Sequence, residues 1–537
     1  MSRLYVDGGK IDEESMEDVP NSELYSNEQQ PLLAGDTVQK SGFGAGGPKE
    51  GCTSYKRQGA NEIATFFNFA KASIGSGSFA LPWGILQVGV LVGGLGMILL
   101  GLASVYTMQL MLECKHYVCA RLPSREKRKS LNYTELGRQA LGGFGKWAVD
   151  ISVLGCNLGV CAGYMIFIAG NLLWAANCFE DKIYNSLHHN TSDNLTSDLL
   201  SLSADDDEDR VCFTTWEVYA LILPILIGLT FLPSFKILAY SAYIGSVFLV
   251  LAVSVVYVFG FINHHVFCAV SQGDILYVPA KGTGIALWFG VTAFLFCVHS
   301  MVIPLESVMK YPHRMQYVLD AALVIVLSVN LPFAIYGYLL FGSATKGYVF
   351  ENLPGGVFYD LVRVFLSVEL TLTFPIVFKP ASDVAEEIWY NFLMVFVRLG
   401  RLKFVEQLYT SSSMYYRVGR YTMLCILRTL LVMVSWSIAV GIPRFELCLA
   451  LVGSLATTIL AFILPPLFHL ALKWRVTSIA RRVFHILLLV GGIAASGVAT
   501  GINLYTAIED RGSVDSCSSI RAQCQAKDTP TGHCFTS

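Results

Sequence analysis

Residues 67–84 read Phe-Asn-Phe-Ala-Lys-Ala-Ser-Ile-Gly-Ser-Gly-Ser-Phe-Ala-Leu-Pro-Trp-Gly, an apolar span with Gly75-Ser76-Gly77 at its middle. In a bilayer every backbone N–H and C=O must be paired within the protein, so helix breakers at mid-depth normally line a polar cavity. Secondary transporters use a span broken in this way to expose helix ends to a substrate. Small residues also let two helices approach closely, so helix packing is the alternative explanation of the same glycines.

Composition places this span in a membrane protein. Of the 537 residues 54% are hydrophobic and 15% are charged, and the mean hydropathy is +0.53. A soluble protein of this size carries roughly 25% charged residues. The apolar residues form runs of about 18 or more, the length that crosses a bilayer. Residues 1–60 hold no apolar core run, so no cleavable signal peptide is expected. The net charge of −2 gives no indication of nucleic acid as a partner.

The apolar runs predict an all-α polytopic membrane protein. We predict eleven spans, near residues 63–89, 91–114, 147–176, 216–232, 236–262, 284–304, 317–341, 358–379, 421–440, 445–471 and 483–507. The expected organisation is therefore a disordered tail over residues 1–60, an eleven-span domain over residues 61–507 and a Cys-containing tail over residues 508–537.

Loop charges predict the orientation of the chain, because Lys and Arg accumulate on the cytoplasmic side. Eight basic residues lie in 115–146, six in 379–420 and four in 473–482, and these segments fall on one side of an eleven-span protein. The loop 179–215 has two basic residues against nine acidic ones. The N-terminus is therefore expected in the cytoplasm and the C-terminus in the lumen or outside the cell.

The acidic loop carries two features of an external segment. The sequons Asn190-Thr-Ser and Asn194-Leu-Thr predict glycosylation of Asn190 and Asn194. Cys178 and Cys212 flank the loop and are expected to form an external disulfide. The pairing of the remaining external cysteines, Cys517, Cys524 and Cys534, is not determined by their spacing.

The N-terminal tail contains a match to a sorting signal. Glu28-Gln-Gln-Pro-Leu32-Leu33 has the spacing of an acidic dileucine motif, an address read by sorting adaptors. The motif favours a lysosomal or endosomal membrane, while the sequons are equally compatible with the plasma membrane. Both locations stay open.

A second break is expected in the sixth span, at Phe296-Cys297-Val298-His299, shortly before Pro304. A histidine and a proline deep in an apolar run cost free energy that packing alone does not require. Spans one and six are five apart, as expected if spans 1–5 and 6–10 are inverted repeats. Amides of the first break would bind a substrate carboxylate, and carbonyls of the second would face the amino group. The predicted substrate site is Ser73, Gly75, Ser76, Gly77, Phe296, Cys297, Val298 and His299.

Three ionisable residues are candidates for ion coupling: Lys71, His299 and Glu369. Intramembrane charges are rare and usually face the protein interior, so Lys71 is expected to be buried. A structural ion pair is the alternative for Lys71 and Glu369, and a hydrogen bond between helices is the alternative for His299.

Several motifs resemble the proton-coupled amino acid transporters of the amino acid/auxin permease family. Lys71-Ala-Ser-Ile-Gly-Ser-Gly-Ser-Phe-Ala-Leu-Pro82 looks like their first-span signature, and Pro304-Leu305-Glu306 followed by Met309-Lys310 looks like the end of their sixth span. The resemblance covers roughly residues 60–507. It implies a fold of the leucine-transporter type, with ten core spans in two inverted repeats and an added eleventh.

Positions that differ from the family pattern indicate which ion, Na⁺ or H⁺, is coupled to transport. Asn68 and Cys297 stand where proton-coupled members commonly carry a histidine and a glutamate, and His299 resembles a residue of sodium-coupled relatives. Lys71 falls where those relatives use an asparagine as an ion ligand, and a cation there would repel Na⁺. We therefore expect transport that is independent of Na⁺ and sensitive to pH.

The sequence favours a secondary active transporter of small, neutral amino acids that works by alternating access and needs no cofactor. An amino-acid-sensing receptor with the same fold and a Na⁺-coupled symporter are the alternatives. An ion channel would require a filter loop or rings of charge. A membrane enzyme is the least supported class, because no nucleophile–base or metal-ligand constellation is recognisable. The amino acid, the direction of transport and the oligomeric state stay open.

Overall fold

The computed structural model describes residues 59–122, 131–192, 214–231, 235–262, 275–279, 281–353, 356–398, 414–442 and 444–509. All of them belong to one compact unit, Ala45–Ser537, and the other unit, Met1–Gly44, lies outside the described residues. Within the described ranges the regular structure is helical, apart from one isolated bridge between Ala60 and Met309. The prediction of an all-α chain is therefore confirmed.

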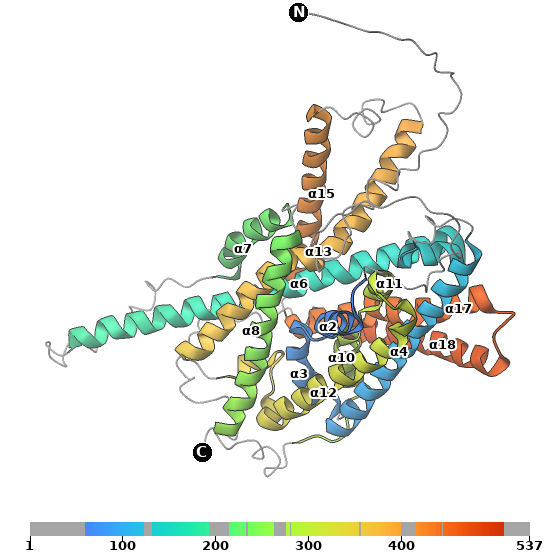
Figure 1. Cartoon of the computed structure of the whole chain (residues 1–537). Helices are drawn as coiled ribbons and strands as arrows, with labels where there is room; N and C mark the ends of the chain where they lie inside the picture. The colour runs from blue at the N-terminus through green and yellow to red at the C-terminus, as the bar shows by residue number, and fades with distance from the viewer. Residues whose placement is uncertain are drawn as a thin grey trace, which may run out of the picture. The chain divides into compact units, whose positions relative to one another are not determined.

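The helices follow the predicted spans in order (Figure 1). The first five predicted spans correspond to α2 (Glu62–Ser73) with η1 (Ser76–Ala80) and α3 (Leu81–Val88), then α4 (Val90–Arg121), α6 (Tyr133–Ser192), α7 (Thr215–Thr230) and α8 (Phe235–Ile262). The next three correspond to α10 (Gly282–Leu295) with α11 (His299–Val308), α12 (Met315–Phe341) and α13 (Val357–Arg398). The last three are α15 (Met414–Gly441), the series α16 (Phe445–Val452), η6 (Gly453–Thr457), η7 (Ile459–Ile463) and α17 (Leu464–Lys473), and finally α18 (Ile479–Glu509).

Eight helical segments among the described residues are long and apolar enough to cross a membrane. Two shorter apolar helices, Thr215–Thr230 and Val247–Ile262, coincide with the fourth and fifth predicted spans. The first predicted span is divided into three short pieces. The chain is a multi-pass membrane protein, and the arrangement of its spans as two inverted repeats stays a prediction.

Two helices extend well beyond the spans that hydropathy marks, α6 and α13. Helix α6 begins at Tyr133, inside the predicted basic loop, and runs to Ser192, inside the predicted acidic loop. Its first turns are separated from the rest by a kink at Leu141 and Gly142, where Gly142 has φ +64°. The side chain of Asn132 accepts a hydrogen bond from the Glu135 N–H at 2.8 Å, the geometry of a helix N-cap. Hydropathy misses this part of the helix because its residues are polar.

Small residues bring α10 into backbone contact with the tenth predicted span. A Cβ atom on Gly453 would lie 1.8 Å from the Gly290 carbonyl oxygen, and one on Gly290 would lie 2.1 Å from the carbonyl oxygen of Ala450. Helices in a membrane associate through such close packing, since lipid tails give no hydrophobic drive for helices to pair. The sixth predicted span is thereby held directly against the tenth.

Candidate functional site

The break expected in the first span is present. Helix α2 ends at Ser73, and Ile74 and Gly75 have extended backbones before η1 begins at Ser76. The Ile74 N–H donates to the carbonyl oxygen of Ala70 at 2.9 Å and closes α2, while the Ser78 N–H donates to that of Gly75 at 3.0 Å. The chain therefore starts a new helical segment at Ser76 with its own N-terminal amides.

The two glycines of this break have different surroundings. A Cβ atom added to Gly75 would meet nothing within 4 Å, so there is open space beside the break. A Cβ atom added to Gly77 would lie 2.8 Å from the ring of Phe294. Gly77 is thus required for packing, and Gly75 borders the space in which a small ligand could lie.

The break expected in the sixth span is also present. Helix α10 ends at Leu295 and α11 begins at His299, so Phe296, Cys297 and Val298 connect them. The Phe296 carbonyl oxygen accepts hydrogen bonds from the Val298 N–H and from the Ser104 hydroxyl, both at 3.1 Å. The Val298 carbonyl oxygen accepts from the Met301 N–H at 3.0 Å. Two of the three carbonyls proposed to face a substrate amine therefore already have donors.

His299 is buried and is held by α4. Its Nε2 lies 2.9 Å from the Thr107 hydroxyl, which itself donates to the Ser104 carbonyl oxygen at 2.8 Å. Because that hydroxyl hydrogen is already used, the network favours the tautomer in which His299 donates through Nε2–H and has an acceptor at Nδ1. Nδ1 has no hydrogen-bond partner among the described residues.

Ser104 and Thr107 are site residues that the sequence interpretation missed. Both are fully buried, they lie three residues apart on one face of α4, and together they fix both ends of the second break. The signal for them is weak, because hydroxyl residues in spans commonly bond only to their own helix. The sequence of α4 alone does not show that Ser104 and Thr107 lie opposite the second break, because their partners belong to another span.

The two breaks lie next to each other. The Gly77 backbone packs on Phe294, at the end of α10, and η1 contacts α10. On another side of the second break, the Cys297 Sγ lies 3.9 Å from that of Cys156 on α6, which is 3.8 Å from the Thr457 hydroxyl on η6. The predicted substrate residues of spans one and six are thus adjacent, and spans three and ten complete their surroundings.

Lys71 is exposed, so the expectation that it is buried was wrong. The buried residues Phe69, Ala70 and Ser73 occupy one face of α2, and Lys71 in the last turn points away from that face. Its charge interacts with the carboxylate of Glu369 on α13. The two candidate coupling residues therefore lie within electrostatic range of each other, with Lys71 in an accessible position.

Glu369 on α13 lies beside α8 and near Tyr164 of α6. Its carboxylate accepts a hydrogen bond from the Thr373 hydroxyl at 3.0 Å and packs against Gly245 of α8. The buried hydroxyl of Tyr164 on α6 lies close enough to be influenced by the charge of Glu369 and by the side chain of Ser76.

Charged pairs and backbone hydrogen bonds join several helix ends to one another. Glu306, in the motif at the end of α11, is fully buried between Lys115 and His116 of α4, with both nitrogens 2.5 Å from its oxygens. The backbone of Ala60 pairs with Val308 and Lys310, with both hydrogen bonds 2.8 Å long. The start of the first span is thus tied to the end of the sixth. Glu113 of α4 likewise pairs with Lys473 at 3.1 Å and Arg481 at 2.6 Å.

Other predicted sites lie outside the described part of the chain. These are the sorting motif with Glu28, Leu32 and Leu33, the sequon residue Asn194, and Cys212, Cys517, Cys524 and Cys534. Asn190 and Cys178 lie on α6, in a stretch whose side chains are not described. Glycosylation, the external disulfide and sorting stay predictions.

Comparison with known proteins agrees with this geometry. The family model described as "Transmembrane amino acid transporter protein" matches residues 59–508. The chain belongs to this family. The resemblance carried by residues 71–82 and 304–310 is thereby confirmed, and the two broken spans are features of a member of the transmembrane amino acid transporter family.

Named relatives of this family member come from Arabidopsis thaliana. It is 27% identical over 414 residues to "Amino acid transporter AVT3C", covering 76% of this chain and 83% of that protein. It is 25% identical to "Amino acid transporter ANT1" (76% and 84% covered) and 27% identical to "Amino acid transporter AVT3A" (83% and 90% covered). These relatives are named as transporters and not as enzymes, in agreement with the expectation for this chain.

Among solved structures, the chain is similar to one described as "Crystal structure of MhsT in complex with L-phenylalanine". The two are 12% identical in sequence with a TM-score of 0.44, and the match covers 83% of this chain and 100% of the other.

Proposed function

We propose that this protein is a secondary active transporter that moves small, neutral amino acids across a membrane by alternating access. The observation that carries the proposal is the pair of adjacent helix breaks, at Ile74–Gly75 and at residues 296–298, in a member of the transmembrane amino acid transporter family. Breaks in two spans that face each other offer unpaired amides and carbonyls to a zwitterionic substrate.

The substrate carboxylate would lie on the amides of Gly75, Ser76 and Gly77, where the second helical segment begins. Amides at a helix N-terminus favour an anion through hydrogen bonds and through the helix dipole. Open space beside Gly75 supports this position. The amino group would face the Cys297 carbonyl, because the carbonyls of Phe296 and Val298 already accept hydrogen bonds.

Coupling is proposed to involve protons and not Na⁺. Lys71 brings a positive charge to Glu369, which makes this neighbourhood unfavourable for a second cation. Protonation of Glu369 would release that attraction and change the charge next to Tyr164 and Ser76. His299 would keep the second break in position through Thr107, and its free Nδ1 makes it a second candidate acceptor for a proton.

The charge distribution also supports a cytoplasmic N-terminus. The basic segments 115–146, 379–420 and 473–482 occupy one side of the eleven-span order. We propose lysosomal or endosomal membranes as the location, on the strength of the dileucine motif alone.

Uptake of a labelled amino-acid panel into proteoliposomes, with and without pH and Na⁺ gradients, tests the proposal. Gly75→Val puts a side chain into the open space without a clash, and its extended backbone suits a β-branched residue. We expect uptake to fall about 100-fold, as misplacement at a binding site can do. Gly497→Val, on α18 with open space around its Cβ, is the matched control and should transport normally.

Normal uptake by Gly75→Val would remove the first break from the site. Amino acid binding by wild-type protein without measurable flux would favour the receptor alternative. Gly77→Val is a poor test, because its side chain would displace Phe294 and a loss of uptake would report only on packing.

A further inference from the structure

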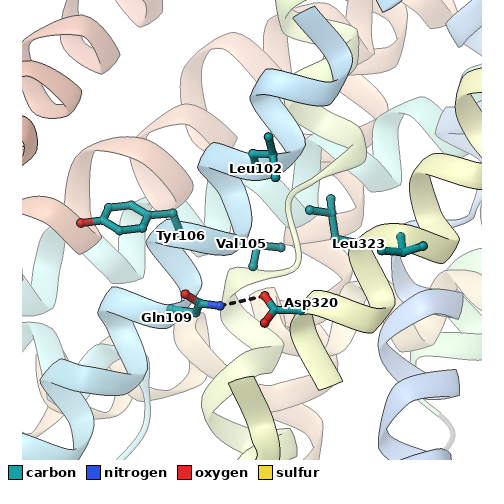
Figure 2. A pocket seen from close by; sticks show the side chains of 7 residues that line it. Leu102, Val105, Tyr106, Gln109, Asp320 and Leu323 are labelled. Carbon is teal, nitrogen blue, oxygen red and sulfur yellow. Dashed lines mark hydrogen bonds between the residues drawn. The ribbon is translucent and has the colours of Figure 1, made fainter. Parts of the chain in front are cut away.

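Helices α4 and α12 line an open pocket of about 370 Å³ (Figure 2). Its volume is in the range of small-molecule sites, roughly 300–1,000 Å³. Helix α4 contributes Leu102, Val105, Tyr106 and Gln109, and α12 contributes Asp320, Leu323 and Val324. Both sets have the spacing of a single helix face. The pocket therefore lies in the seam between two spans.

The pocket opens on an exposed apolar surface of the two spans. Leu102 is 54% exposed and Val324 is 65% exposed, and further along α4 Leu99 is 66% exposed. Apolar side chains exposed on spans normally face hydrocarbon. A molecule that enters this pocket would therefore come from the bilayer.

Polar and apolar groups in the pocket are separated along the length of the two helices. Gln109 and Asp320 lie at one end of the pocket and Leu102 lies at the other (Figure 2). Asp320 is five residues after the start of α12 at Met315, about 8 Å along the helix, so it lies near one end of this span. The apolar residues continue from there toward the bilayer centre.

The carboxylate of Asp320 is incompletely satisfied. One of its oxygens accepts a hydrogen bond from the Gln109 amide at 2.8 Å. Within the described residues no second donor reaches it, and its side chain is exposed. A charged group on a lipid-facing surface is costly and is normally paired or functional. The pocket thus offers a hydrogen-bond acceptor and, beside it, an amide.

We propose that this pocket binds a sterol, with its hydroxyl group between Gln109 and Asp320 and its ring system against Leu102, Val105, Leu323 and Val324. The hydroxyl donates to the free carboxylate oxygen, and the rigid rings point toward the bilayer centre, as the polarity of the pocket requires. A phosphate group is disfavoured, because Asp320 would repel it and no cation lines the pocket. A rigid ligand also loses little conformational entropy when it binds.

Bound sterol would act on transport through α4. Ser104 and Thr107 hold the second break, and the pocket residues of α4 lie between and beside them in sequence. Sterol that fixes α4 against α12 would therefore stabilise the second break in the arrangement that Ser104 and Thr107 hold. This consequence rests on the proposed function, whereas the binding site itself does not.

Photolabelling of the full-length protein in sterol-containing nanodiscs tests the binding site without any transport assay. A sterol with a photoreactive ring system should label peptides of α4 and α12, and unlabelled sterol should compete. The epimer with the inverted hydroxyl group should compete about tenfold less well, because it loses the hydrogen bond to Asp320. This comparison uses wild-type protein and does not depend on how a variant folds.

Labelling of variants with substitutions inside and outside the pocket then tests whether the sterol binds in it. Val324→Trp fills the pocket and should reduce labelling about tenfold, while Val329→Trp on another face of α12 should leave it unchanged. Asp320→Ala should reduce it to a similar extent. Equal competition by both epimers, competition by diacylglycerol or phospholipid in place of sterol, or labelling confined to other helices would overturn the proposal. Failure of Gly75→Val to block uptake would leave the labelling result intact and would count only against the proposed function.

Discussion

Glu306 offers the sharpest test of how the end of the sixth span is held. Its side chain has no exposed surface, and its two oxygens are 2.5 Å from Lys115 Nζ and His116 Nε2. The Lys115 side chain is only 4% exposed, so Glu306→Leu would leave an ammonium group buried beside a single carbonyl, that of Ile303 at 3.5 Å. Breaking a buried pair by removing one partner costs about 3–5 kcal/mol. We expect a loss of unfolding free energy of that size.

The double variant Lys115→Met/Glu306→Leu separates charge from packing. Replacing both partners by apolar side chains is often neutral or stabilising, so the double variant should recover most of the stability lost in Glu306→Leu. Glu62→Leu is the control, because its partner Arg314 is 56% exposed and such pairs contribute about 0–1 kcal/mol.

The free energy of unfolding can be measured for all four proteins by titration with SDS in mixed micelles. A loss below about 1 kcal/mol in Glu306→Leu would contradict the argument that Lys115 needs a buried partner. A double variant as unstable as the single one would show that Glu306 acts through packing and not through charge.

Four further outcomes are expected. Thr107→Val removes the hydroxyl that holds His299 and should lower initial uptake about tenfold, whereas Thr107→Ser should retain it; equal rates would exclude this contact from the site. Replacing external Na⁺ by choline should change the initial rate little, and a steep Na⁺ dependence would refute Na⁺-independent transport. Glu369→Gln should flatten the pH dependence of the rate, and an unchanged pH profile would exclude Glu369 from proton coupling. Leu32→Ala with Leu33→Ala should move the protein to the cell surface in microscopy, and an unchanged distribution would make the motif match accidental.

Hydropathy is sufficient to locate the helices, because a segment that crosses lipid must be apolar and must pair its own backbone groups. The same constraint makes Gly75-Ser76-Gly77 and residues 296–299 stand out as breaks, since both place helix-breaking or polar residues inside an apolar run. Helical turns outside the bilayer, as in the first part of α6, follow no such rule, and hydropathy predicts them as loops.

The sequence by itself determined that the chain is an all-α membrane protein with two interrupted spans, since both properties depend on residues that are neighbours along the chain. Tertiary structure alone decided which partners those residues meet. Ser104 and Thr107 hold the second break through hydrogen bonds from α4, and Glu306 of α11 neutralises Lys115 of α4. Each of these contacts joins different helices. Their formation depends on how the helices pack and turn against one another, which the order of residues within any one span does not specify.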